Sequence, residues 1–329
     1  MAQGNPSPGR VASRRALHTA AIVAALAIAQ PTAQAQVDCG STGDAPALLR
    51  VAPGVWRVPA ARGEANAENG GLTTQLVVVR DSARVWMIGS GPTPAFGHAL
   101  ACAIRQTAGR SATDVVNTRA APELSMGNVA FAHARLWALA DVIAAMRQRC
   151  ETCRERLQAR IGAAGASLQP DQIRVPDRSV APAGASAGRL GPFDWRAYER
   201  ADGERVLALR HRRTGVVIAQ GLLWSDAVPE LRDTRSDRLL VALRGLQGFG
   251  AGATYLGEQG EPATAINVAA QIGYLEALRR EVRERLRRGE DPASAVVPLP
   301  QYAQWPDYST WHPLNVQHVW RELEPEIFR

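Results

Sequence analysis

Hydrophobic and polar positions divide the chain into short extended segments and longer helical ones. Alternating or continuous apolar runs predict strands at residues 49–58, 72–79, 84–88, 114–117, 206–210, 216–223 and 253–256. Apolar spacings of three and four predict helices from about residue 94, over 128–161, near 237–245 and over 268–288. Residues 162–192 are rich in Ala, Gly and Pro and are expected to form a long connection with a short strand at 172–175. Strand-rich halves that each end in helices predict two sheets in contact with helices outside.

The predicted helix at 268–288 has one apolar face and one charged face. Its apolar positions repeat at spacings of three or four and are Ile272, Leu275, Leu278, Val282 and Leu286. Its opposite face carries Glu–Arg pairs four residues apart, at 276/280, 281/285 and 284/288. We interpret this arginine-rich side as a solvated helix face rather than a site for a polyanion.

The N-terminal segment has the pattern of an export signal. No acidic residue occurs before Asp38, three arginines precede the apolar run at 20–29, and Ala33-Gln34-Ala35 follows as a small-x-small cleavage site. This predicts a signal over residues 1–35 and a periplasmic or secreted mature domain over 36–329. Ser13-Arg14-Arg15 is also compatible with a twin-arginine signal, so the export route stays open. The apolar run is too short to cross a bilayer, and no membrane span is predicted.

Charge and cysteine content narrow the functional classes. The chain has 38 basic residues, all of them Arg, and 31 acidic residues. Without the three arginines of residues 1–35 the charge is 35 minus 31, or +4, so no nucleic-acid partner is implied. Export would place Cys39, Cys102, Cys150 and Cys153 in an oxidising compartment, where two disulfides could form. Cys39–Cys102 with Cys150–Cys153 is the simplest of three possible pairings.

Several strings, taken in order, resemble the metallo-β-lactamase-fold hydrolases over residues 50–325. Residues 51–56 (VAPGVW) are similar to the opening strand of that family, 68–71 (ENGG) to the turn after it, and 86–91 (WMIGSG) to its V-I-D-T-G segment. Residues 114–118 (DVVNT), with 127–128 (GN) further on, bracket the position of the H-x-H-x-D-H metal motif. The resemblance implies an α+β fold: a four-layer αβ/βα sandwich of two mixed sheets packed face to face, with a zinc site at one edge.

A narrower resemblance is to the quinoprotein relay system zinc metallohydrolases. It rests on residues 146–153 (MRQRCETC) and 315–324 (NVQHVWRELE). It implies a periplasmic quinoprotein dehydrogenase system as a possible partner. The aromatic tail at about 300–329 is interpreted first as a cover packed over the core, and docking on such a partner is the alternative.

The positions that match the family's zinc ligands hold no imidazole. In the main motif the histidines are replaced by Arg119, Ala121 and Leu124, and the aspartate by Glu123. The other ligand positions, a histidine, the bridging aspartate and the last histidine, fall on Arg200, Gly221 and Gln259, and the supporting aspartate falls on Gly89. Zinc needs imidazole, thiolate or carboxylate donors, and a guanidinium repels a cation. We therefore expect no metal cofactor at this position.

Two functional hypotheses follow from this loss of ligands. The first is an exported pseudoenzyme that binds a small anionic ligand in the former metal cleft, through Arg119 and Arg200, or binds a periplasmic protein. The second is an active hydrolase with a displaced metal site, or with acid–base chemistry around Glu123, Asp226 or Glu258. The histidines show no pair spacing that would indicate a rebuilt zinc site. The C-x-x-C string lies within a predicted helix, whereas a redox motif of this kind is expected at the start of a helix after a strand.

Overall fold

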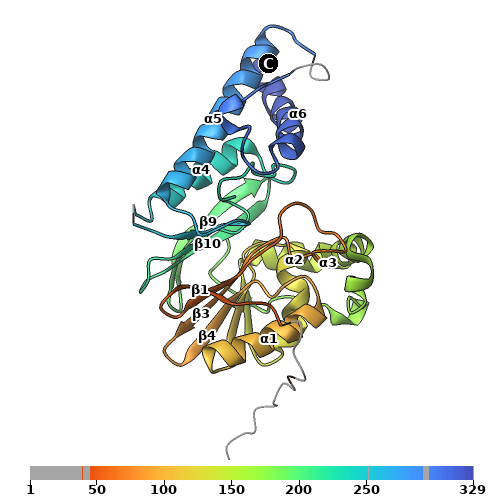
Figure 1. Ribbon diagram of the computed structural model, residues 1–329, viewed down its shortest axis with the longest axis vertical. Coiled ribbons are helices and arrows are strands. Elements are labelled where there is room, and N and C mark those ends of the chain that lie inside the picture. Colours follow the sequence, from red (N-terminus) through yellow and green to blue (C-terminus); the bar gives the residue numbers. More distant parts are fainter. Residues whose placement is uncertain (1–38, 40–44, 251, 292–295, 329) are drawn as a thin grey trace, which may run out of the picture. The chain divides into compact units, whose positions relative to one another are not determined.

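The first sheet has seven strands in chain order, and both of its faces pack against hydrophobic core residues. In the computed structural model, which describes residues 39, 45–250, 252–291 and 296–328, the order is β1-β2-β3-β4-β5-β6-β7 (Figure 1). Its strands are β1 (Leu49–Ala52), β2 (Val55–Val58), β3 (Leu76–Asp81), β4 (Arg84–Ile88), β5 (Asp114–Val116), β6 (Arg135–Ala138) and β7 (Arg178–Ser179). Pairing is antiparallel from β1 to β4 and parallel from β4 to β7. The sheet is therefore mixed.

The second sheet has five strands in the order β12-β11-β10-β9-β8. Its strands are β8 (Ala187–Leu190), β9 (Phe193–Ala201), β10 (Glu204–His211), β11 (Val217–Ile218) and β12 (Tyr255–Leu256). Only β11 and β12 pair in parallel. The strands predicted at 206–210 and 216–223 pair with each other, but the second is confined to the two residues of β11.

Alternation along the strands builds the layers. In β3, Val77 and Val79 join the core shared by the two sheets, whereas Leu76 and Val78 face α1 (Pro94–Ala108) on the outer side. In β10, the odd-numbered Leu207 and Leu209 face the first sheet. The even-numbered positions of β10 pack with α4 (Ser236–Gln247), α5 (Ala265–Arg287) and α6 (Tyr308–Ile327). The predicted α+β class, with two mixed sheets face to face and helices outside, is confirmed.

The predicted helix at 128–161 is wrong in its first part. A 3-10 helix covers Met126–Phe131, β6 follows, and α3 begins only at Ala140 and ends at Ile161. The apolar spacing of this stretch suits a helix, but parallel pairing with β5 claims residues 135–138. The predicted strand at 172–175 is also wrong, because Pro170–Gln172 forms a 3-10 turn and β7 lies beyond Pro176. The remaining short helices are α2 (Pro122–Ser125), η2 (Gly162–Gly165) and η4 (Pro300–Tyr302).

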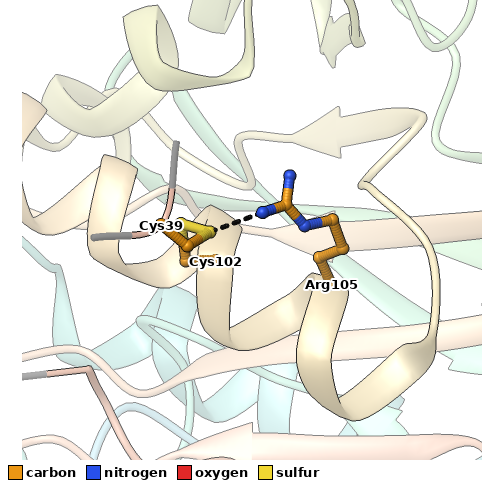
Figure 2. Close-up of a disulfide and its surroundings, with 3 residues drawn as sticks. All are labelled: Cys39, Cys102 and Arg105. Carbon is orange, nitrogen blue, oxygen red and sulfur yellow. Dashed lines mark hydrogen bonds between the residues drawn. A yellow bond between two sulfur atoms is a disulfide. The ribbon is translucent and has the colours of Figure 1, made fainter. Parts of the chain in front are cut away.

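One predicted disulfide is present and the other is not. Cys39 is bonded to Cys102 on α1, with a Cα–Cα distance of 5.7 Å, and Nη2 of Arg105 lies 2.8 Å from the Cys39 sulfur (Figure 2). Cys150 and Cys153 are free thiols on α3. Their pairing fails because Cys150 points into the core whereas Cys153 lines a cleft. The helix therefore directs the two sulfurs to different surroundings.

The C-terminal segment covers the core, as the sequence predicts. Trp311 and Trp320 of α6 are buried, and Tyr302, Trp305 and Tyr308 pack against the same cluster. All the described residues fall within one compact unit, Val37–Arg329. The predicted export signal at 1–35 lies outside the described residues. Within the part that is described, no helix is long and apolar enough to cross a membrane.

Candidate functional site

A cleft of about 620 Å³ brings together most of the residues that the sequence selects. Arg119, Ala121, Glu123, Arg200 and Gln259 all line it. Leu124 and Gly221 are fully or almost fully buried and lie outside that lining. The resemblance thus points to one continuous region contributed by both sheets.

The loop after β5 carries Arg119 and is held rigidly on both sides. The amide of Leu207 in β10 donates to the carbonyl of Thr118 at 2.9 Å. Within the loop, Asn117 Nδ2 donates to the carbonyl of Leu124 at 3.0 Å and Asn128 Nδ2 donates to Asn117 Oδ1 at 2.8 Å. These bonds fix the backbone position from which the Arg119 side chain extends.

Arg119 is bound by two carboxylates. Its Nη1 lies 3.1 Å from Glu123 Oε1, and its Nη2 lies 2.5 Å from Glu258 Oε1 and 3.2 Å from Thr74 Oγ1. Burial lowers the pKa of Arg119, but the charges of Glu258 and Glu123 outweigh it and hold that pKa above its ordinary value. Both terminal nitrogens of Arg119 are therefore engaged within the protein.

Glu258 is the centre of this network, and sequence reasoning gave it only a secondary place. Its Oε1 accepts from Thr74 Oγ1 at 2.6 Å as well as from Arg119, and its Oε2 accepts from the Gly221 amide at 2.7 Å. The resemblance instead points to Gln259, whose side-chain amide donates to the carbonyl of Thr73 at 3.0 Å. The sequence did contain a signal for Glu258: it is an acidic residue two positions after a buried strand, in a segment that the resemblance places at the site.

Two glycines make room for the side chains that fill the site. Gly221 has φ +72°, and a Cβ atom built on it would lie 2.8 Å from Nε of Arg119. Gly89 has φ +75°, and a Cβ atom there would lie 2.5 Å from Leu124 and 2.8 Å from Leu76. The absence of a side chain at Gly221 and at Gly89 therefore leaves the space that Arg119 and Leu124 occupy.

Arg200, near the end of β9, lies in the same cleft without an ionic partner. Among the described residues, no carboxylate lies within ion-pair distance of its guanidinium, and its buried Nε has no hydrogen-bond acceptor. Burial lowers the pKa of Arg200 to about 10, and the charge of Arg119 acts in the same direction, whereas the carboxylates of Glu258, Asp233 and Glu204 oppose the shift from beyond ion-pair distance. Arg200 is thus a charged, partly desolvated group whose bonding capacity is unused.

These residues do not fit the zinc centre that the resemblance implies. Ala121, Leu124 and Gly221 offer no donor atom, and Glu123 and Glu258 are both bound to a guanidinium. In the part of the chain that the structure describes, no group of three or more His, Cys, Asp and Glu side chains is arranged to hold a metal ion. No step of a metal-dependent reaction can be built on this donor set.

Comparisons with known proteins define the fold. No protein-family model and no curated protein sequence matches the chain. It is similar in structure to the metallo-β-lactamase FIM-1 from Pseudomonas aeruginosa in its mono-zinc form, with a TM-score of 0.57, 12% identity, and coverage of 70% of this chain and 95% of that one. A metallo-β-lactamase from Hirschia baltica (0.54, 10%, 70% and 97%) and one from Pontibacter korlensis (0.54, 11%, 70% and 99%) are also similar. The chain therefore has the metallo-β-lactamase fold, as the resemblance predicts.

Proposed function

We propose that this chain is an exported pseudoenzyme on the metallo-β-lactamase fold, which binds a small anionic ligand in its cleft instead of hydrolysing a substrate. The observation that carries the proposal is the guanidinium of Arg200, which lines the cleft and forms no ion pair with any residue that the structure describes. A partly buried charge without a direct ion-pair partner is unfavourable, so a site of this kind is stabilised by a ligand that supplies the opposite charge in contact with it.

Arg200 suits a carboxylate or phosphate better than a metal. A guanidinium presents parallel N–H donors that match two oxygen atoms of such a group and bind it through charge-assisted hydrogen bonds. The sequence predicts anion binding by Arg119 as well as by Arg200, but in the structure both terminal nitrogens of Arg119 are already hydrogen-bonded within the protein. We therefore assign ligand binding to Arg200 and a structural role to Arg119.

Isothermal titration with acetate, succinate and phosphate tests the proposal. We expect binding to the wild-type protein and a loss of at least about tenfold in affinity for Arg200→Gln, because the charged fork is removed. Arg200→Lys keeps the charge without the fork and should fall between the two. Arg156→Gln is the matched control, because Arg156 lines the same cleft but is exposed to solvent. Equal binding by Arg200→Gln and wild type would overturn the assignment.

Elemental analysis separates this proposal from the hydrolase alternative. Protein purified without chelator should contain no stoichiometric zinc, iron or manganese, and added zinc should not raise its melting temperature. One or two metal ions per chain would mean that ligands exist which the described residues do not reveal, and the hydrolase with a displaced metal site would replace the pseudoenzyme.

Export and partnership extend the proposal. The Cys39–Cys102 disulfide supports an oxidising compartment such as the periplasm. A quinoprotein dehydrogenase partner rests on the resemblance at 146–153 and 315–324. The buried Trp311 and Trp320 do not favour docking through the aromatic tail. Capture of such a dehydrogenase from a periplasmic extract on immobilised full-length protein would support the partnership, and retention equal to that on an unrelated exported protein would exclude it.

A further inference from the structure

The cleft carries almost as much negative as positive charge. Seven arginines and six acidic residues line it. Several of them neutralise one another: Arg149 lies 2.5 Å from Glu204, and Arg232 pairs with Glu64 and lies 3.0 Å from Glu230. A multiply charged anion such as a diphosphate would meet this set of carboxylates at close range. The lining favours a ligand of low net charge.

The segment 230–235 brings two carboxylates to the cleft, together with Arg232 and Arg235. Glu230 and Asp233 lie three residues apart in the segment before α4, and both line the cleft. Burial raises the pKa of Glu230, and the nearby charges of Asp233, Glu258 and Glu64 add to that effect while Arg232 opposes it. Among the described residues Asp233 has no ion-pair or hydrogen-bond partner. A cationic group placed here would relieve the crowding of carboxylates.

Thr234 lies in the same segment, next to Asp233 and close to Arg200. The Thr234 residue is 1% exposed, lines the cleft, and has a hydroxyl oxygen without a hydrogen-bond partner. The amide of the next residue, Arg235, donates to the carbonyl of Arg200 at 2.8 Å. The segment 230–235 therefore runs beside Arg200 and presents a buried, unused hydroxyl together with two carboxylates, whereas its arginines are engaged, Arg232 with Glu230 and Arg235 with Asp237. A hydroxyl both donates and accepts, so it can serve either end of a polar ligand.

We infer that the ligand is dipolar: a small molecule with one carboxylate and one ammonium group. Its carboxylate would pair with the guanidinium of Arg200, with the Thr234 hydroxyl as a further donor, and its ammonium group would lie toward Glu230 and Asp233. This inference rests on the proposed anion-binding function. It adds a preference that Arg200 alone could not produce, since a guanidinium binds a simple carboxylate and an amino carboxylate alike.

Matched sets of small molecules test the inference. The probes are glycine, β-alanine and γ-aminobutyrate, with acetate, propionate and butyrate lacking the amine, and methylamine, ethylamine and propylamine lacking the carboxylate. We expect at least one amino carboxylate to bind the wild-type protein at least about tenfold more tightly than either of its single-charge analogues. Arg200→Gln should weaken both the amino carboxylate and the simple carboxylate.

Variants of Glu230 and Asp233 separate the inference from the proposed function. The double variant Glu230→Gln, Asp233→Asn should lose the preference for the amino carboxylate and keep its binding of the simple carboxylate. Glu276→Gln is the control, because Glu276 is exposed and pairs with Arg244 on the outer helices. Equal affinity of wild type for the two ligand classes would overturn the dipolar ligand and leave anion binding intact. Binding of none of the probes would count against both.

Discussion

The side chain of Arg119 occupies the space that a side chain at position 221 would need. A Cβ atom built on Gly221 would lie 2.8 Å from Nε and 3.0 Å from Cδ of Arg119. The same glycine donates its amide to Glu258, which in turn binds the guanidinium. The position of the Arg119 side chain thus depends on the absence of a side chain at Gly221, and a change at either residue would disturb the other.

Gly221→Ala should therefore be more destabilising than an ordinary glycine substitution. The positive φ costs about 1–2 kcal/mol for a residue with a Cβ, and overpacking against Arg119 adds about 1–3 kcal/mol. Gly203→Ala is the matched control, because Gly203 has φ +75° with no atom within 4 Å of a built Cβ. Urea unfolding measures both free energies. Equal losses for the two variants would mean that Arg119 moves aside without strain.

Arg119→Met should leave the carboxylates of Glu123 and Glu258 without their counter-charge. Removing one partner of a buried ion pair destabilises by about 3–5 kcal/mol. Protonation of the uncompensated carboxylates removes the unfavourable charge, so the deficit relative to wild type should shrink as the pH falls. The triple variant Arg119→Met, Glu123→Gln, Glu258→Gln should recover most of the lost stability at neutral pH. A deficit that is the same at every pH would contradict this electrostatic account.

Stability should fall on mild acidification because of His312. Its Nε2 lies 2.6 Å from the carbonyl of Val297, and its Nδ1 lies 3.0 Å from the hydroxyl of Tyr274. Burial lowers the pKa of His312 below its ordinary 6.5, although the bond to Val297 opposes the shift. Below pH 6.5 the unfolded chain binds the extra proton and the folded protein does not, so stability is lost as the pH drops toward the lowered value.

A variant identifies the His312 contribution. His312→Gln should flatten the dependence of the unfolding free energy on pH between neutral and mildly acidic conditions. Buried His211, whose pKa is also lowered by burial, should retain part of the slope. His98→Gln, at an exposed position of α1, should leave the slope unchanged. A slope in His312→Gln identical to that of wild type would assign the acid sensitivity elsewhere.

The free thiol of Cys150 should be unreactive in the folded protein. Burial raises the pKa of Cys150 to about 11 and also raises the pKa of Cys153. The thiolate is the reactive form, so alkylation by iodoacetamide at pH 7 should be at least about 100-fold slower for Cys150 than for free cysteine. Denaturation without reductant should expose two reactive thiols, and denaturation with reductant should expose four. Fast native alkylation at Cys150 would mean that α3 opens readily.

Periodicity predicted the sheets and the outer helices because those segments are amphipathic or uniformly apolar. The run at 76–79 is buried on both faces, and the apolar stripe of α5 packs on the second sheet, as its spacing requires. Residues 135–138 could not be assigned in this way, because their apolar spacing suits a helix and only pairing with a distant strand makes them extended. Tertiary hydrogen bonding decided that segment, and no local signal records it.

The candidate site was predictable in position but not in connectivity. The flanking motifs placed Arg119, Glu123, Arg200 and Gln259 at one cleft, and the structure brings them there. The sequence could not show that Arg119 forms an ion pair with Glu258 and that Arg200 has no ion-pair partner among the described residues, because both facts depend on side-chain directions across two sheets. Only the three-dimensional structure distinguishes the paired Arg119 from the unpaired Arg200.

The guanidinium of Arg119 is part of the polypeptide, whereas a metal ion would have to be bound from solution. This difference affects the stability of the whole cleft. A cation drawn from solution stabilises a protein in proportion to the logarithm of its concentration, so such a site loosens when the supply falls. The guanidinium between Glu123 and Glu258 belongs to the polypeptide, and its effective concentration is set by the fold. The geometry of this cleft should therefore stay constant across environments that differ widely in available metal. Chelating agents should not change the melting temperature of the protein.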